Sequence, residues 1–338
     1  MTNILEIAKA AGVSKTTVSR VLNNKPDVKP ETRKRITDLI QQHDFQPNAA
    51  ATAISSKKNV NTIGLIIPYD ANYIFGNPFN TEIMRGVSSE TNAAGYHLML
   101  CYFHKEEYVA VFKQKRVAGF ILISPGKDQR TMISRLKEIG APFVSTSRVP
   151  NVPDINFVEI DNVHGAELAV KHLIQLGHRR IGVIKGPNHL TSSVDRFKGY
   201  CETLASNNIS FDDHLVQEGN SSIESGYGAM SVLMKMNPDM TAVFVASDLM
   251  AIGAIGAVTQ TGKKVPDDIS VVGYDGIPLA GSLNPALTTI DQHASEKGAY
   301  AAKMLIDIIE GREVEKKPVL EVDIKEREST GPCKEQQQ

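Results

Sequence analysis

The 338-residue sequence is poor in the features that mark secreted, membrane-bound or metal-stabilised proteins. Its three cysteines, Cys101, Cys201 and Cys333, are far apart and form no CxxC pair, so neither a disulfide framework nor a structural zinc site is predicted. No apolar run approaches the roughly 18 residues that a membrane helix needs. The first residues lack the charged and then apolar segments of an export signal. We therefore expect a cytoplasmic protein with no membrane partner.

Motifs of catalysis and cofactor binding are also missing. The sequence has no GxSxG, no HExxH, no GxxxxGKS/T, and no GxGxxG after a strand-like run. The nine histidines show no metal-ligand spacing. Gly253 and Gly256 fall inside a predicted helix, where they favour close packing over phosphate binding. We expect no enzyme, no metal site and no cofactor.

Charge is unevenly distributed, although the net charge is only −1. Residues 1–60 contain ten Lys or Arg against five Asp or Glu, which gives this segment a net charge of +5. The rest of the chain carries 27 basic and 33 acidic side chains. A basic N-terminal segment on an acidic body indicates contact with nucleic acid at that end.

Three short helices are predicted in residues 1–45. Asn3 and Glu6 have the spacing of a capping box, which starts a helix at Ile4. Ser14 can cap a second helix, and Pro30 suits the first turn of a third. Three helices in so short a segment make a marginal domain that would gain stability from a partner.

The first two helices have the spacing of a helix-turn-helix. Ala8 lets the helices approach closely, Gly12 suits the strained turn, and Val18 closes the core. The polar residues 46–60 that follow have too little apolar surface to fold alone. We expect them to form a hinge that orders only on binding.

From Thr62 onward, short apolar runs alternate with amphipathic helical stretches. Strands are predicted at 63–67, 97–102, 119–123, 143–146, 157–160, 180–185, 242–246, 269–274 and 287–290. Helical stretches are predicted between the strands, for example at 80–94, 163–176, 195–207, 249–261 and 295–310. Continuous apolar strands between helices predict parallel sheets covered on both faces. About 270 residues are too many for one such sheet, so we expect an α/β fold of two lobes with a cleft. The last residues, 331–338, are expected to form a flexible tail.

The helix-turn-helix segment, from Ile4 to Asn24, closely resembles the headpiece of the lactose-repressor (LacI/GalR) family of bacterial transcription regulators. The resemblance continues through Leu176-Gly-His-Arg-Arg-Ile-Gly182, Ser247-Asp248, Val265-Pro-Asp-Asp-Ile-Ser-Val-Val-Gly-Tyr-Asp275 and Leu287-Thr-Thr-Ile290. It implies a headpiece at 1–45, a hinge at 46–60 and a two-lobed core at 61–330 that is similar to periplasmic sugar-binding proteins. The N-terminal lobe would comprise about 61–161 and 292–318, and the C-terminal lobe about 162–291 and 319–330.

By matching positions, the resemblance implies a DNA-binding surface on the second helix and the hinge. Arg20 can bond guanine O6 and N7 together, which makes it the best candidate for reading a base. Lys15 and Thr16 would face base edges beside it, while phosphates would be bound by Ser14, Thr17, Ser19 and Asn23. The alternative is that Lys15 and Arg20 belong to a solvated helix face.

The hinge residues resemble a helix that enters the minor groove. Ile54 stands where family members place an apolar wedge, and Asn48 and Ala51 would lie beside the DNA with it. Thr52 replaces an arginine that is usual in the family, which removes one expected phosphate contact. The alternative is a plain linker.

The resemblance also implies an effector site between the lobes. Arg196, Asp248 and Asp275 match positions that bind ligand hydroxyls, and carboxylates with a guanidinium suit a polyol. Further candidates for this site are Phe79, Ser124, Arg148 and Asp161. Alternatively, Asp248 only caps a helix, and Asp275 only ends a strand in a turn.

These observations favour a homodimeric DNA-binding regulator that responds to a small molecule. The resemblance implies a repressor of a carbohydrate-utilisation operon with a pseudopalindromic operator and a sugar effector. One alternative is a regulator that responds to a purine or a sugar phosphate by corepression. Another is a sugar-binding receptor, which would need an export signal in place of the basic headpiece.

Overall fold

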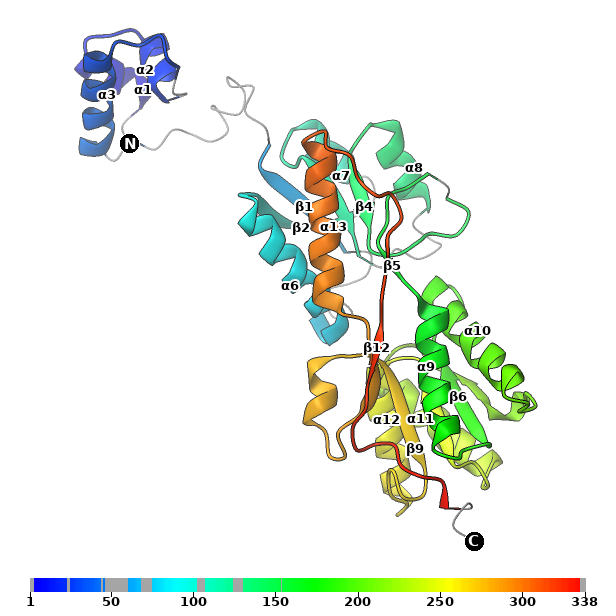
Figure 1. Ribbon diagram of the computed structural model, residues 1–338. Coiled ribbons are helices and arrows are strands. Elements are labelled where there is room, and N and C mark those ends of the chain that lie inside the picture. The colour runs from blue at the N-terminus through cyan, green and yellow to red at the C-terminus, as the bar shows by residue number, and fades with distance from the viewer. Residues whose placement is uncertain are drawn as a thin grey trace. The chain divides into compact units, whose positions relative to one another are not determined.

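The computed structural model describes residues 3–22, 25–43, 45, 60–67, 75–101, 107–123, 130–152 and 154–334. The chain divides into two compact units, Met1–Val60 and Asn61–Gln338 (Figure 1). Within the described parts of both units, no helix is long and apolar enough to cross a membrane.

The N-terminal unit contains helices α1 (Ile4–Ala10), α2 (Lys15–Leu22) and α3 (Pro30–Gln42). Their predicted starts are confirmed: the capping box of Asn3 and Glu6 is formed, and Ser14 Oγ accepts from the Thr17 N–H at 3.1 Å. Gly12 adopts a φ of +64°, which a side chain would strain. The core of the unit is formed by Ile7, Ala8, Ala11, Val18, Val21, Val28 and Ile36.

The second unit begins with a parallel four-stranded sheet in the order β2-β1-β3-β4. The strands are β1 (Thr62–Ile66), β2 (His97–Cys101), β3 (Gly119–Leu122) and β4 (Phe143–Ser145). Helices α6 (Pro78–Ala93) and α13 (Ala294–Ile309) pack on one face, and α7 (Glu107–Lys113) and α8 (Arg130–Glu138) pack on the other. Successive strand residues point to opposite faces, which explains the continuous apolar runs.

A six-stranded sheet in the order β12-β10-β9-β8-β6-β7 forms the other half. Its strands are β6 (Ile181–Lys185), β7 (Val216–Glu218), β8 (Ala242–Val245), β9 (Ser270–Asp275), β10 (Thr288–Asp291) and the antiparallel β12 (Asp323–Lys325). Helices α9 (Asn162–Gln175) and α10 (Thr191–Ser206) cover one face. The other face is covered by α11 (Ile223–Met236) and α12 (Asp248–Gln260). Short 3-10 turns lie at Asp213–Leu215 and Pro278–Ser282.

The chain passes between the two sheets three times (Figure 1). It leaves β5 (Glu159–Ile160) through Asp161 into α9, returns from β10 through Gln292 and His293 into α13, and crosses again from β11 (Val319–Leu320) to β12. Strands β5 and β11 pair with each other in parallel between the sheets. The predicted division into two α/β lobes of mainly parallel strands is confirmed.

Two features differ from the sequence expectation. Strands β7, β11 and β12 were not predicted, because they are two or three residues long and carry no apolar run. The flexible tail predicted from residue 331 was wrong for residues 331–334. The Cys333 N–H donates to the Leu176 carbonyl at 2.8 Å, and Cys333 is buried. Residues 335–338 lie outside the described residues.

Candidate functional site

The second helix of the N-terminal unit presents a polar face opposite its buried one. Val18 and Val21 pack inward, whereas Lys15, Thr16 and Arg20 are exposed. The Arg20 guanidinium pairs with Asp27, with 3.3 Å between Nη1 and Oδ2, and about half of each side chain remains accessible. The bases and phosphates of a duplex can therefore reach this helix without any rearrangement of the core.

The other candidate DNA contacts fall into two groups. Ser14 and Thr17 join through their hydroxyls at 2.9 Å at the start of α2, and Ser19 is half-buried on the same helix. The remaining candidates, Asn23, Asn48, Ala51 and Ile54, lie outside the described residues.

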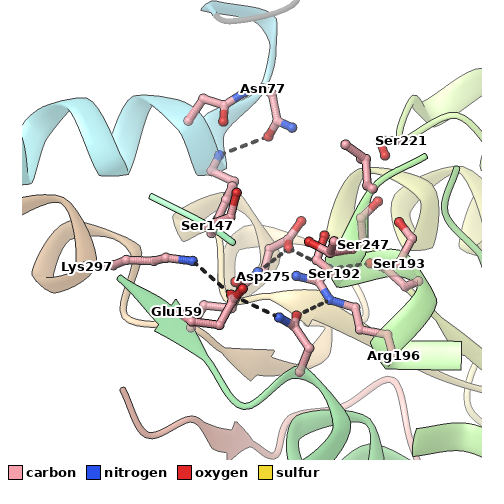
Figure 2. Close-up of a pocket in the computed structure, with 17 residues that line it drawn as sticks. Asn77, Ser147, Glu159, Ser192, Ser193, Arg196, Ser221, Ser247, Asp275 and Lys297 are labelled. Atoms are coloured by element: carbon pink, nitrogen blue, oxygen red, sulfur yellow. Dashed lines mark hydrogen bonds and ion pairs between the residues drawn. The ribbon is translucent and has the colours of Figure 1, made fainter. Parts of the chain in front are cut away.

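A pocket opens between the elements of the two sheets in the second unit (Figure 2). Its cavity volume is about 80 Å³, which is below the roughly 300–1,000 Å³ of most small-molecule sites, so a ligand would also occupy the open mouth. The lining is strongly polar: Asn77, Phe79, Asn80, Ser147, Glu159, Asn162, Leu190, Thr191, Ser192, Ser193, Arg196, Ser221, Ala246, Ser247, Asp275, Gln292 and Lys297. Such a lining suits a ligand rich in hydroxyls more than an apolar one.

Arg196 of α10 is held from several sides at this pocket. Its Nε donates to Asn162 Oδ1 at 2.9 Å, and its Nη1 donates to the Ala246 carbonyl at 2.7 Å and to Asp275 Oδ1 at 3.2 Å. The guanidinium carbon also lies 3.7 Å from the centre of the Tyr274 ring. These contacts hold the Arg196 guanidinium in place at the edge of the pocket, where the residue is only 7% exposed.

Asp275 ends β9 and supplies the carboxylate opposite Arg196. Its Oδ1 also accepts from Gln292 Nε2 at 2.5 Å. Burial raises the pKa of Asp275 to about 6, although the nearby Arg196 charge lowers it in part. A ligand that donates hydroxyl hydrogens to this carboxylate would stabilise its charged form.

Asp248 lies behind Asp275 and does not line the pocket. Its Oδ1 accepts from Thr289 Oγ1 at 2.6 Å, and its Oδ2 accepts from the Ile277 N–H at 2.9 Å. Burial and then the Asp275 charge raise the pKa of Asp248 well above its usual range. Because Asp248 is fully buried and is not part of the lining, a ligand in the pocket does not reach its side chain.

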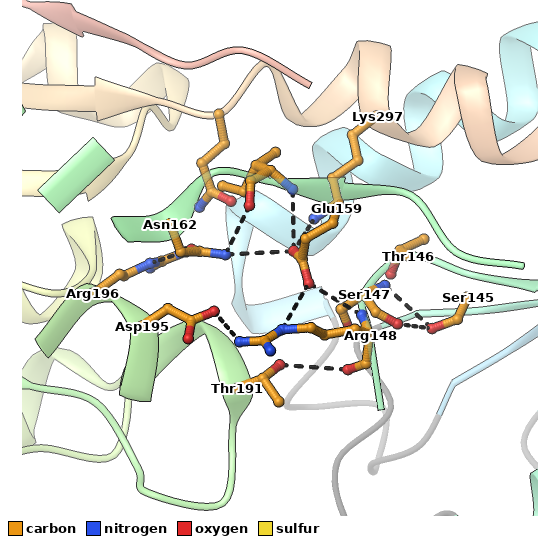
Figure 3. Close-up of polar contacts among 12 residues, drawn as sticks. Ser145, Thr146, Ser147, Arg148, Glu159, Asn162, Thr191, Asp195, Arg196 and Lys297 are labelled. Atoms are coloured by element: carbon orange, nitrogen blue, oxygen red, sulfur yellow. Dashed lines mark hydrogen bonds and ion pairs between the residues drawn. The ribbon is translucent and has the colours of Figure 1, made fainter. Parts of the chain in front are cut away.

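The structure brings three of the predicted effector residues to the pocket: Phe79, Arg196 and Asp275. Asp161 instead caps α9, where its Oδ1 accepts from the His164 N–H at 2.9 Å. Arg148 pairs with Glu159 and Asp195 beside the pocket rather than lining it (Figure 3). Ser124 lies outside the described residues.

Several polar residues of the pocket were missed by the sequence analysis, among them Glu159, Asn162, Gln292 and Lys297. The sequence held a signal for Lys297. It stands three residues after Ala294 and four before Ala301, so it falls on the apolar face of the predicted helix. A lysine on a buried helix face is rare unless it is paired or functional.

One cluster of potential metal ligands occurs among the described residues. Asp291, His293 and Asp323 bring one ligand atom each within 4.8 Å of one another. His293 Nε2 already lies 2.7 Å from Asp323 Oδ1, and Asp323 also pairs with Lys325. The acids are therefore balanced by neighbouring side chains, and we assign no ion to them.

Comparison with known proteins matches both units. The family model "Bacterial regulatory proteins, lacI family" matches residues 3–48, and the model "Periplasmic binding protein-like domain" matches residues 170–330. The transcriptional regulator CelR of Thermobifida fusca is 34% identical and covers 96% of both chains. The transcriptional repressor PurR of Photorhabdus laumondii is 36% identical over 93% of this chain and 92% of its own.

Solved structures agree with these matches over nearly the whole chain. A CelR–cellobiose complex is similar with a TM-score of 0.76 and 32% identity, covering 97% of this chain and 100% of that one. The lac repressor dimer bound to operator and the anti-inducer ONPF gives a TM-score of 0.85 at 28% identity, covering 98% and 99%.

Proposed function

Because this chain belongs to the lacI family of bacterial regulatory proteins, whose members compared above are transcriptional regulators, we propose that it represses a carbohydrate-utilisation operon in the cytoplasm. It binds a pseudopalindromic operator as a homodimer, and a sugar-type effector in the pocket controls that binding. It needs no cofactor and catalyses no reaction.

The observation that carries this proposal is the exposed polar face of α2. Lys15, Thr16 and Arg20 share it, while the opposite face closes the core of the unit. Among the candidate phosphate contacts, Ser14 precedes this helix, Thr17 and Ser19 belong to it, and Asn23 follows in the sequence. We assign residues 1–45 to the DNA-binding headpiece and 46–60, with Asn48, Ala51 and Ile54, to a hinge that enters the minor groove.

The pocket supports the effector part of the proposal. We assign ligand binding to Phe79, Arg196 and Asp275, because they line the pocket and combine an apolar ring with fixed charges. Residues 61–330 form the effector-binding core. A ligand that draws its two lobes together would move the starts of the hinges in the dimer and so change operator affinity.

The homodimer has support on the surface of α11. This helix exposes the large apolar side chains Ile223, Tyr227, Val232 and Met236, and 3-10 residue Leu279 is also exposed. Apolar surface of this kind favours an interface between subunits. A corepressed regulator of purine type is the second candidate, since PurR is among the relatives. The hydroxyl-rich lining and the single aromatic ring among the described lining residues favour the sugar.

Selection of operator sites from a random pool of duplexes by the full chain tests the DNA-binding proposal. We expect a pseudopalindromic sequence to be enriched. In Arg20→Ala, the affinity for that sequence should fall about tenfold or more, because a bidentate base contact is lost. Nonspecific binding should persist and remain sensitive to salt.

The matched control is Arg35→Ala, which removes the same charge from an exposed position on α3. It should lower specific and nonspecific affinity by similar small factors. The proposal is wrong if the wild-type chain enriches no sequence. The role of Arg20 is wrong if the two variants discriminate equally well between the selected site and random DNA.

A further inference from the structure

Lys297 places a buried ammonium at the wall of the pocket (Figure 2). Its side chain is only 5% exposed, and its one ion pair, between Nζ and Glu159 Oε1, is 3.9 Å long. Among the described residues, no acceptor forms a hydrogen bond with this ammonium. Burial lowers the pKa of Lys297, as expected for a cation that has lost water without gaining close partners.

Glu159 does not depend on Lys297 for its own stability (Figure 3). Its Oε1 accepts from the Ile160 N–H at 3.1 Å and from Asn162 Nδ2 at 3.4 Å, and its Oε2 accepts from the Arg148 N–H at 3.2 Å. The Arg148 guanidinium adds a charge 3.8 Å from the same carboxylate. The acid is therefore satisfied by shorter contacts, and the lysine is not.

The guanidinium of Arg196 also has hydrogen-bond donors that are not used within the described residues. Its Nε and Nη1 are engaged, but Nη2 forms no hydrogen bond with any residue that the structure describes. On the acidic side, Asp275 Oδ1 already accepts from Arg196 and Gln292. Arg196 Nη2 and the Lys297 ammonium thus remain as cationic donors at the pocket wall, and a ligand that brings acceptors complements them.

We propose that the effector is a sugar acid, a polyhydroxylated molecule with one carboxylate, and that Lys297 binds this carboxylate. The inference rests on the proposed function, in which this pocket is the effector site. The serine hydroxyls and the Arg196–Asp275 pair would hold the hydroxyls. A carboxylate fits better than a phosphate, because the pocket wall that holds the Lys297 ammonium also holds two carboxylates, Glu159 and Asp275, which would repel a dianion more strongly than a monoanion.

Calorimetric titration of the full chain tests this with matched pairs of ligands: D-glucuronate and D-glucose, D-galacturonate and D-galactose, D-gluconate, and glucose 6-phosphate. We expect at least one acid to bind about tenfold or more tightly than its neutral counterpart, since a charge-assisted hydrogen bond contributes at least this factor. In Lys297→Met, that preference should fall to about one.

Equal or tighter binding of the neutral sugars overturns the proposal, as does a preference for the phosphate or failure of every acid to bind. If the wild-type chain still selects an operator in any of these cases, only the sugar-acid inference fails. If it selects none, the proposed function fails as well.

Thermal unfolding without any ligand gives a second test that needs no effector. Lys297→Met should raise the melting temperature, because it removes a buried charge that has only one long ion pair and keeps the length of the side chain. Lys303→Met is the control, since Lys303 is exposed on the same helix, and it should change little. A melting temperature that falls in Lys297→Met shows that the pair with Glu159 is structural and overturns the ligand role.

Discussion

At the scale of single residues, the pocket is organised around one fixed cation. Arg196 contacts side chains or carbonyls from α9, from the residue that follows β8, and from β9, and it stacks on Tyr274. A guanidinium held on this many sides has little rotamer freedom left to lose when a ligand binds. Pre-organisation of this kind raises affinity by lowering the entropic cost of binding.

Asp275→Asn removes the charge opposite Arg196 while keeping the size of the side chain. We expect effector affinity to fall by about tenfold or more, because the hydrogen bonds of ligand hydroxyls to a charged acceptor are lost. Titration of the variant with an effector that binds the wild-type chain measures the loss. Asp161→Asn is the control: Asp161 caps α9 outside the pocket, so effector affinity should stay within about twofold. Unchanged effector affinity in Asp275→Asn would remove this aspartate from the site.

The three aspartates show what sequence position can predict. Asp161, Asp248 and Asp275 each follow or end an apolar run, and all three match the pattern expected of a cleft residue. Only Asp275 reaches the pocket. Asp161 accepts from its own helix start, and Asp248 accepts from Thr289 and the Ile277 N–H, which lie far away in the sequence. The sequence predicts which residues lie at the edge of the sheet. The direction of the Asp248 carboxylate depends on hydrogen-bond partners that are distant in the sequence, which a local pattern does not reveal.

At the scale of elements, long apolar runs were predicted well and short polar strands were not. The nine predicted strands all overlap strands, because burial on both faces leaves a continuous apolar signature. The crossing strands β11 and β12 have no such signature, since they are held by pairing with β5 and β10. Strands that are defined only by such tertiary pairing cannot be predicted from the local sequence pattern.

Helices α11 and α12 approach closely at Gly253, as the sequence predicted for a small residue there. A Cβ at Gly253 would lie 1.9 Å from the Ile223 carbonyl oxygen and 2.7 Å from the Tyr227 nitrogen. Gly256, one turn further, has nothing closer than 3.8 Å. Gly253→Ala should therefore lower stability by about 2 kcal/mol or more, since backbone atoms must move apart. Gly256→Ala should raise it by about 0.5–1 kcal/mol, because alanine favours the helix.

Chemical denaturation of both variants measures these changes. The two substitutions add the same methyl group to the same helix, so they differ only in what that methyl group meets. Stabilisation by both would show that the contact between α11 and α12 is not as close as the structure has it.

The ordered C-terminal residues create a pH dependence around His178. This imidazole is buried, with Nδ1 2.9 Å from Thr241 Oγ1 and Nε2 3.0 Å from both Ser270 Oγ and the Gly331 carbonyl. Burial lowers the pKa of His178 below its ordinary value of 6.5, although the Gly331 carbonyl raises it in part. Below pH 6.5 the unfolded chain binds a proton that the folded chain resists, so stability falls as pH falls through this window.

Comparison of the wild-type chain with His178→Gln measures the contribution of His178 to the pH dependence of stability. We expect the free energy of unfolding to drop more steeply between about pH 7 and 5.5 in the wild-type chain than in His178→Gln, which cannot titrate. Urea unfolding at several pH values gives both slopes. Because Asp275 is unchanged in the variant, its titration cancels in the difference. Parallel slopes would show that His178 takes up its proton equally well in both states.

At the scale of the whole molecule, the pocket takes its lining from elements that belong to both sheets of the second unit. Phe79 lies on α6 and Lys297 on α13, whereas Arg196 lies on α10 and Asp275 on β9. The three crossings are the covalent links between these groups of elements. A ligand that contacts all four residues would therefore favour one arrangement of the two lobes over others, which is the requirement for a conformational signal.

If effector and operator act through one shared equilibrium, their effects on each other must be equal. We expect the effector to change operator affinity by about 5–150-fold, and the operator to change effector affinity by the same factor. Operator affinity is measured by fluorescence anisotropy with and without saturating effector, and effector affinity by calorimetry with and without operator. Arg20→Ala is the control, since a duplex that is no longer recognised should leave effector affinity unchanged. A factor of about one in the wild-type chain, for an effector that binds the pocket, would show that the pocket does not control operator binding.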